Sequence, residues 1–243
     1  MLRLTTTILA LILTFSHAFA DELDKITIAG WSKPISEITN ILAEPDKGFF
    51  KAEKIELGYI SGTGGGSALT NMLSGAADVA FTDPSSLYQA LSRGEDLVAI
   101  YNIYPQNVFN VVVPVGRGIT TTADLKGKTI GVYSLNSGTR QNLLFLLHKA
   151  GLNESDVNIQ VTGLLNFAPV IQGQVDATAA TDTGLYVGKL KGLGDVTVIN
   201  VADSLNVPSD LFVVTRGYYK ENKSVLRRFL KAYHNSTQWM IDN

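Results

Sequence analysis

The stretch SGTGGGSALT, residues 61–70, places three consecutive glycines between a strand pattern and a helix pattern. The run 55–60 before it alternates apolar residues as a half-buried strand does, and Leu69, Met72 and Leu73 follow at helical spacing. A helix that opens directly after a strand leaves unpaired backbone N–H groups in its first turn, and these suit an anion or the polar edge of a ligand. A plain flexible connector is the alternative interpretation.

This glycine loop does not match a nucleotide-binding signature. Counted from Gly62, a G-x-G-x-x-G frame requires glycine at position 67, where the chain has Ser67. A P-loop requires Gly-Lys-Ser/Thr, and the stretch has no lysine. We therefore do not expect the loop to bind a nucleotide.

The composition indicates a folded protein of ordinary charge. The chain has 243 residues, enough for two domains, and is 45% hydrophobic and 17% charged. A formal net charge of −2 gives no electrostatic case for nucleic acid. The chain has no cysteine, which excludes disulfides, thiolate metal sites and cysteine nucleophiles, and its three histidines do not cluster. We predict no metal, no cofactor and no catalytic triad.

Residues 1–20 have the pattern of a secretory signal peptide. Arg3 precedes the apolar run 8–15, and Ala18-Phe19-Ala20 has the A-x-A form of a cleavage site. No later segment approaches the roughly 18 consecutive apolar residues of a membrane span. We expect an exported, periplasmic protein, and an uncleaved N-terminal anchor is the alternative.

Strand and helix patterns alternate along the chain, which predicts an α/β fold with parallel sheets. The segment 128–134, KTIGVYS, resembles KITIAGWS at 25–32, and GQVDA at 173–177 resembles GAADV at 75–79. Both matches lie roughly 100 residues apart in the chain. Two similar α/β units explain this pattern, although strand–turn–helix units also resemble one another by chance.

The repeat suggests a division of the chain into lobes. We expect a signal peptide over residues 1–20, a first lobe over 21–112 and a second lobe over 113–210. Residues 211–243 then return to the first lobe and end in a C-terminal helix. The β-rich runs 108–115 and 211–215 are then the two passages between lobes. The helical pattern over 220–243 has no capping glycine at its end, so we expect that the C-terminus is truncated.

In open parallel sheets, ligands bind beyond the carboxyl ends of the strands. Aromatic strand ends suit the planar or apolar part of a ligand, whereas hydroxyls and helix-opening N–H groups suit an acidic or carbonyl part. Each candidate also has a purely structural explanation. Trp31 can be a core residue, Thr82 and Asp83 can be helix N-caps, and Arg140 can bind either a ligand anion or a carboxylate such as Asp176. The candidate ends are Trp31-Ser32, Ser61–Ser67, Thr82-Asp83, Ser134–Thr139, Asn166 and Thr181-Asp182.

The segment DLKGKTIG at 124–131, followed by SGT at 137–139, is the most specific of several motifs in the chain. Together these motifs, which cover most of residues 25–220, resemble the periplasmic substrate-binding proteins of nitrate/sulfonate/taurine-type ABC importers, the SsuA/THI5-like or NMT1-like group. The supporting motifs are GFFKAE at 48–53, the glycine loop, LSGAADVAFTD at 73–83, and QGQVD at 172–176 with Thr181-Asp182.

The resemblance implies a two-lobed type II periplasmic-binding-protein fold with two crossover strands and a small-molecule ligand between the lobes. It also implies closure on binding and delivery to an ABC permease and its ATPase subunit in the inner membrane, with the binding protein as a monomer. Family members usually continue with further C-terminal helices. By the same analogy the ligand-binding residues are Trp31, Gly64, Gly65, Gly66, Ser67, Thr82, Asp83, Ser134, Ser137, Gly138, Thr139, Asn166 and Asp182.

Two other functions stay open at this point. The group that the chain resembles also includes the yeast thiamine-pyrimidine synthases, but those enzymes use a cysteine-rich motif with a histidine and a lysine. This chain has no cysteine and no histidine between residues 18 and 147, so we expect no enzyme. A periplasmic ligand sensor is the other alternative.

The ligand itself is left open by the sequence. The predicted site has few candidate cations, essentially Lys33 and Arg140, so a bare divalent anion is a poor fit for it. An aromatic or heterocyclic compound, such as a thiamine-precursor pyrimidine, fits the aromatic strand ends better, and a sulfonate stays open.

Overall fold

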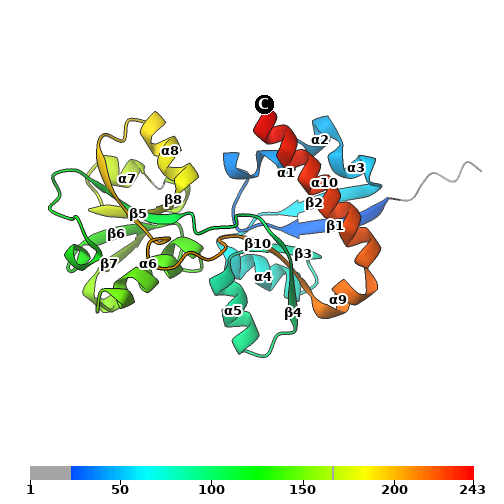
Figure 1. Ribbon diagram of the computed structural model, residues 1–243, viewed down its shortest axis with the longest axis horizontal. Coiled ribbons are helices and arrows are strands. Elements are labelled where there is room, and N and C mark those ends of the chain that lie inside the picture. The colour runs from blue at the N-terminus through cyan, green and yellow to red at the C-terminus, as the bar shows by residue number, and fades with distance from the viewer. Residues whose placement is uncertain (1–22, 166) are drawn as a thin grey trace, which may run out of the picture.

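The computed structural model describes residues 23–165 and 167–243, which form two lobes, each built on a five-stranded sheet (Figure 1). The first sheet has the order β2-β1-β3-β10-β4 and the second the order β7-β6-β8-β5-β9. The strands of the first sheet are β1 (Asp24–Ala29), β2 (Ile55–Ile60), β3 (Val79–Thr82), β4 (Leu97–Asn102) and β10 (Leu211–Thr215). Those of the second are β5 (Phe109–Pro114), β6 (Thr129–Val132), β7 (Asn158–Val161), β8 (Ala177–Thr181) and β9 (Val196–Asn200).

Both sheets are mixed, whereas the sequence pattern predicted parallel ones. β10 runs antiparallel to β3 and β4, and β5 runs antiparallel to β8 and β9. The physical reason is that each of these strands enters its sheet from the other lobe. Such a strand arrives at the opposite end from strands that are linked by helices within the lobe.

Helices cover both faces of the first sheet. Alternate side chains along β1 point to opposite faces, so Ile28 and Ala29 belong to different apolar cores. One face packs against α1 (Thr39–Leu42), α3 (Phe49–Ala52) and α10 (Lys223–Asp242), the other against α4 (Gly65–Leu73) and α5 (Pro84–Ser92). The first lobe also contains α2 (Glu44–Lys47) and α9 (Arg216–Glu221).

The second lobe is layered in the same way. Its larger core joins β6 to α6 (Gly138–Lys149), and its smaller one joins β5 and β8 to α7 (Ala168–Ile171), next to α8 (Asp182–Leu190). Short 3-10 turns complete the two lobes at Ser36–Ile38, Thr122–Leu125, Glu154–Asp156 and Gly163–Leu165. No helix within the described residues combines the length and the hydropathy of a membrane span. The predicted signal peptide, 1–20, lies outside the described residues.

The two sheets repeat one another strand for strand, and a carboxylate explains the repeated sequence motif. In the first lobe, Asp78 accepts a hydrogen bond from the backbone N–H of Thr27 at 2.8 Å and donates its own N–H to the Thr27 carbonyl at 2.9 Å. In the second, Asp176 and Thr129 make the same two bonds, both at 2.8 Å. The aspartate of GAADV and of GQVDA therefore fixes the start of the third strand of its lobe against the first.

The chain passes between the lobes along residues 103–108 and 201–210. All the residues of β5 up to Pro114 pair within the second sheet, so the boundary predicted between 112 and 113 falls inside a strand. The valine-rich run is a buried strand that the first passage enters, not the passage itself. β10 likewise begins at Leu211, where the second passage ends. We therefore propose that the first lobe ends before Phe109.

Replacing Asp78 should destabilise the first lobe. Asp78→Ala removes the part-buried hydrogen bond that the Thr27 N–H donates to a charged acceptor, which should cost about 1–3 kcal/mol of unfolding free energy. Urea unfolding followed by circular dichroism measures this loss. Glu95→Ala, at an exposed position of the same lobe, is the control and should change stability by less than about 0.5 kcal/mol. Equal stability of the two variants would contradict the role given to Asp78.

Candidate functional site

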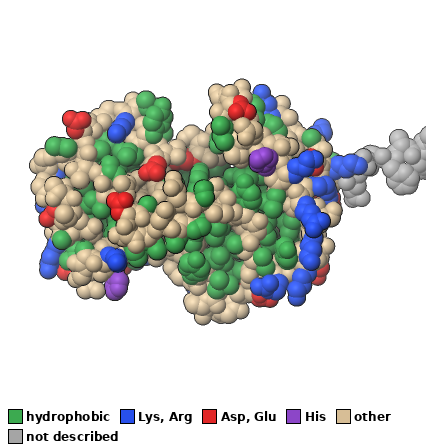
Figure 2. Space-filling model, viewed as in Figure 1, with side chains coloured by type: hydrophobic (Ala, Val, Ile, Leu, Met, Phe, Trp, Pro, Cys, Tyr) green, Lys and Arg blue, Asp and Glu red, His purple; other side chains and the backbone are tan. Residues whose placement is uncertain are grey.

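A cavity of about 580 Å³ lies between the two lobes and is lined by residues from both. Its volume is in the range of sites that hold small organic molecules. On the face shown in Figure 2, the surface is hollowed between the lobes. The lining comes mainly from the segments that follow the carboxyl ends of strands, which is where the sequence predicted a ligand site.

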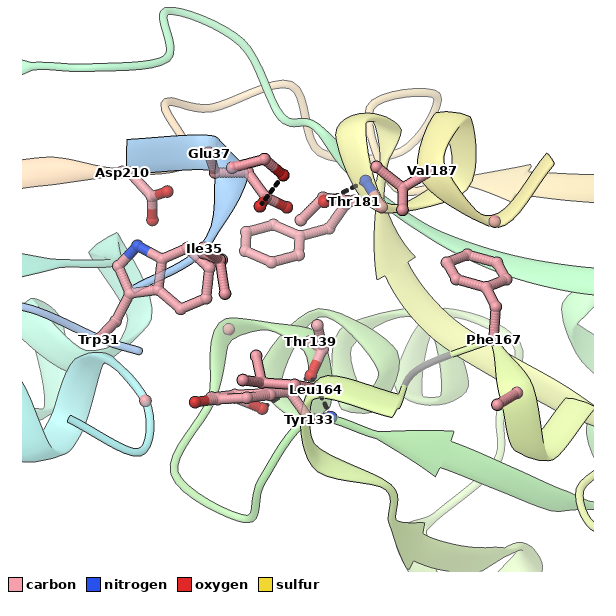
Figure 3. A pocket seen from close by; sticks show the side chains of 18 of the residues that line it. Trp31, Ile35, Glu37, Tyr133, Thr139, Leu164, Phe167, Thr181, Val187 and Asp210 are labelled. Carbon is pink, nitrogen blue, oxygen red and sulfur yellow. Dashed lines mark hydrogen bonds between the residues drawn. The ribbon is translucent and has the colours of Figure 1, made fainter. Parts of the chain in front are cut away.

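Aromatic rings form much of the wall of this cavity (Figure 3). Trp31, after β1, meets Tyr133, after β6, edge to face with ring centroids 6.0 Å apart. Trp31 also packs against the buried Phe81 at 6.3 Å, so it is both a core residue and a lining residue. Its indole N–H is buried and has no hydrogen-bond partner among the described residues. Phe109 and Phe167 add rings from the second lobe.

The glycine loop brings the lobes into contact at the cavity. Gly64 has a φ of 126°, a conformation that strongly favours glycine, and a Cβ there would lie 2.2 Å from the carbonyl oxygen of Asn136 in the second lobe. A Cβ on Gly65 would lie 2.1 Å from a carboxylate oxygen of Asp83. Both glycines line the cavity, and both positions require the absence of a side chain.

The loop's N–H groups are mostly used within the protein. Gly64 donates to the carbonyl of Trp31 at 2.7 Å, Gly66 to that of Asn136 at 3.4 Å, and Thr63 to Oγ of Ser67 at 2.7 Å. The expectation that these groups are unpaired is therefore wrong. The acceptor for Thr63 lies in the loop itself, whereas the sequence could not reveal those for Gly64 and Gly66, because they belong to another turn and to the other lobe.

Four predicted residues, Gly66, Ser67, Thr82 and Ser134, hold this region together without lining the cavity. The hydroxyl of Ser67 donates to the Gly64 carbonyl at 2.9 Å. Thr82 is fully buried and donates to the Gly65 carbonyl at 2.9 Å. Ser134 donates across the lobes to the Thr63 carbonyl. These contacts explain why polar residues occur here without any ligand.

Three predicted residues at the start of α6 do line the cavity: Ser137, Gly138 and Thr139. Ser137 is the N-cap of α6, and its hydroxyl lies 2.6 Å from the Ser134 carbonyl and 2.7 Å from Oγ1 of Thr139. A Cβ on Gly138 would lie 2.6 Å from the ring of Phe109. The two hydroxyls already have protein partners, so their contact with a ligand stays a prediction.

The predicted aspartates differ in their surroundings. Asp83 lines the cavity and is also the N-cap of α5, where it accepts hydrogen bonds from the N–H and the hydroxyl of Ser86 at 2.9 and 2.8 Å. Asp182 is exposed, accepts a hydrogen bond from the Asn110 side chain at 2.9 Å, and does not line the cavity. Its neighbour Thr181 lines the cavity instead. Asn166 lies outside the described residues.

Sequence reasoning missed two carboxylates of the cavity, Glu37 and Asp210. Asp210, the last residue before β10, is only 8% exposed and makes no side-chain hydrogen bond or ion pair within the described part of the chain. Burial raises its pKa well above the ordinary aspartate value, and the charges of Asp83 and Glu37 raise it further. Burial also raises the pKa of Asp83, against the hydrogen bonds from Ser86.

Positive charge is scarce in the cavity. Arg140 binds Glu154 through contacts of 2.6 to 3.0 Å, so it pairs neither with Asp176 nor with the cavity. Lys33 does not line the cavity, whereas Lys191, an exposed residue after α8, does. In Figure 2, Lys and Arg side chains gather on the outer edge of the first lobe, away from the hollow. Within the described residues, no group of His, Cys, Asp or Glu is placed to hold a metal ion.

Comparison with known proteins agrees with this architecture. A sequence model of the family described as NMT1/THI5 like matches residues 35–243. The riboflavin-binding protein RibY of Chloroflexus aurantiacus is 25% identical over 214 residues, which are 86% of this chain and 60% of RibY. A protein of Haemophilus influenzae named for thiamine biosynthesis is 31% identical over 243 residues, 98% of this chain and 75% of that protein.

An enzyme and a binding protein of solved structure are also similar. The 4-amino-5-hydroxymethyl-2-methylpyrimidine phosphate synthase of Schizosaccharomyces pombe is 23% identical over 232 residues, 90% of this chain and 66% of the enzyme. The solved structure of the alkanesulfonate-binding protein SsuA from Xanthomonas axonopodis pv. citri, bound to MOPS, has a TM-score of 0.70 at 20% identity and covers 88% of this chain and 73% of SsuA. The fold is thus that of the type II periplasmic binding proteins, as predicted.

Replacing Gly64 should disturb the contact between the lobes. Gly64→Ala places a methyl group against Asn136 and strains the backbone, at a cost of about 1–3 kcal/mol from the backbone alone. Gly118→Ala is the control, because its φ of 66° is also positive but a Cβ there meets open space. Urea unfolding should show a larger loss for Gly64→Ala. A smaller or equal loss would mean that the loop moves away freely.

Asp210→Asn should stabilise the protein at neutral pH. A folded-state pKa above the unfolded one means that the wild type loses stability as the pH rises past the ordinary carboxyl pKa. The amide avoids this loss, and each gained kcal/mol should raise Tm by about 2–4 °C. Melting curves of the wild type and the variant are recorded from pH 3 to 8, that is, from about one unit below the ordinary aspartate pKa to about four units above it. The two Tm values should converge at the acid end, where Asp210 is protonated and neutral like the amide. A lower Tm for the variant at neutral pH would contradict the prediction.

Proposed function

We propose, given that the chain belongs to the NMT1/THI5-like family, that it is the substrate-binding component of an ABC importer and captures a small organic ligand between its two lobes. The observation that carries the proposal is the cavity between the lobes, walled by aromatic rings from both. Neither lobe alone provides this site, since Trp31 comes from the first and Tyr133 from the second. A ligand would therefore favour the closed arrangement of the lobes.

The proposed ligand is an aromatic or heterocyclic compound. Trp31, Tyr133, Phe109 and Phe167 offer ring faces and edges, and a flat molecule gains more from such walls than a compact inorganic anion does. RibY and the Haemophilus influenzae protein carry names that refer to riboflavin and to thiamine biosynthesis, which is consistent with this choice. A thiamine-precursor pyrimidine is one candidate. A sulfonate, suggested by the likeness to SsuA, is the second ligand class.

The enzyme interpretation has weaker support. The cavity lining in the described residues includes no histidine, and the chain has no cysteine to supply the motif of the pyrimidine synthases. The Schizosaccharomyces pombe enzyme is 23% identical to this chain, so the distinction between binding protein and enzyme depends on the site and not on the overall similarity. We infer a binding protein that acts in the periplasm as a monomer and delivers its ligand to a membrane permease with its ATPase. The predicted signal peptide, 1–20, supports export.

A thermal-shift screen of residues 21–243 tests this function. We expect a shift with one class among pyrimidines, flavins, thiamine, sulfonates and nitrate, because a ligand at 100 times its Kd stabilises the folded state by about 2.7 kcal/mol. Trp31→Ala should abolish the shift. Trp239→Ala is the matched control, since this second tryptophan packs on Phe49 in the first lobe and does not line the cavity.

Two results would contradict the proposal. One is a ligand whose shift survives Trp31→Ala unchanged, which would place its site elsewhere. The other is turnover of a bound pyrimidine or cofactor precursor to a new product, detected by mass spectrometry, which would favour the enzyme.

A further inference from the structure

The cavity has an acidic end. Glu37 and Asp210 lie beside Trp31 in Figure 3, with Phe167 and Val187 across from them on the second lobe. Asp83 lines the same cavity and adds a third carboxylate to its wall. The opposite side is mainly apolar, and its lysine, Lys191, is exposed. A ligand in this cavity therefore meets negative charge at one end and hydrocarbon at the other.

Among these carboxylates, Asp210 is the one that lacks a partner. Asp83 is satisfied by the N–H and hydroxyl of Ser86, and Glu37 accepts a long hydrogen bond of 3.4 Å from Ser36. Asp210 makes no side-chain hydrogen bond or ion pair in the described chain although it is 92% buried, that is, 8% exposed. An unpaired ionised carboxylate at such a position is unfavourable, so the group either takes up a proton, in line with its raised pKa, or meets a cationic partner that the protein does not supply.

On this basis, and resting on the function proposed above, we propose that the cavity selects ligands that present a positively charged nitrogen group to Asp210. An ionised carboxylate only accepts hydrogen bonds, and its strongest partners are cationic N–H donors such as amidinium or ammonium groups. An anionic group at the same place would meet the carboxylate of Asp210, and Glu37 and Asp83 add negative charge to the same cavity. The acidic end thus argues against a sulfonate as the group bound there.

Two other partners for Asp210 fit less well. A metal ion would need several ligating groups around it, and no such arrangement exists in the described residues. The buried indole N–H of Trp31, which also lacks a partner, lies near Asp210 in Figure 3. The two groups form no hydrogen bond in the described chain, and an indole carries a single N–H, so it could satisfy only one of the two carboxylate oxygens. The indole therefore supports the same site without replacing the ligand.

Three probes of one shape test this inference. Benzamidine, benzamide and benzoate share a planar aromatic ring. At neutral pH benzamidine is positively charged, benzamide is neutral and benzoate is negatively charged. Saturation-transfer NMR at neutral pH measures their Kd values on residues 21–243, including millimolar ones. We expect benzamidine to bind about tenfold or more tightly than benzamide, the factor typical of one charge-assisted hydrogen bond, and benzoate to bind least.

Variants at position 210 complete the test. Asp210→Asn keeps the shape of the side chain but removes its negative charge. The preference for benzamidine over benzamide should then fall to less than about twofold, because a neutral amide does not attract the positive charge of benzamidine. Asp203→Asn removes an exposed charge from the same passage between lobes and should leave the preference unchanged. Melting curves of both variants show whether each is folded at the temperature of the binding measurement.

Different results would overturn the selection for positive charge and the proposed function itself. If benzoate or a sulfonate from the thermal-shift screen binds through Trp31 more tightly than benzamidine, the cavity is a ligand site but the selection for positive charge is wrong. If benzamidine binds Asp210→Asn as it binds the wild type, Asp210 is not its partner, and the inference is again overturned. If no probe and no compound in the screen binds, the proposed function fails, and the inference fails with it.

Discussion

The contact between the lobes depends on the glycine loop, whose backbone lies so close to neighbouring residues that it leaves no room for a side chain. At Gly64 a Cβ would meet the Asn136 carbonyl at 2.2 Å, and at Gly65 it would meet the Asp83 carboxylate at 2.1 Å. These two approaches bring the end of β2 against the start of α6 and the end of β3. The aromatic pair Trp31 and Tyr133 then meets across the cleft, and the cavity becomes enclosed between the lobes. Glycine is required here by packing rather than by anion binding.

The duplicated architecture is compatible with the proposed closure of the lobes on a ligand. Each lobe has its own sheet with cores on both faces, so it can move as a unit on the two passages 103–108 and 201–210. The strands that these passages enter, β5 and β10, lie within the sheets and are largely buried. Movement at a passage is therefore transmitted to a whole lobe. Among the described residues the interlobe bonds of the glycine loop are few, which suits the proposal that a ligand shifts the balance between open and closed forms.

The sequence predicted the fold and the strand ends at the cavity because both depend on local patterns and on matches to a family. Trp31, Asp83 and Ser137 lie within five residues of the carboxyl end of a strand, and the topology brings such ends together. Asp210 and Arg140 show the limit. Asp210 stands at a strand start and looks like a surface residue until the packing around the cleft buries it. Arg140 takes Glu154 as its partner, and a distance of 14 residues along the chain does not reveal that pairing.

The unpaired carboxylate shows how stability and binding can be linked. Buried charge at Asp210 opposes folding, because the folded state holds a group that water solvates better. The same property makes a complementary ligand gain more from binding, since the ligand supplies the interaction that the protein lacks. A protein with a hydrophobic residue at this place would be more stable and less selective. The cavity thus combines apolar walls, which a flat molecule can use, with a buried and unpaired carboxylate that distinguishes among such molecules by their charge.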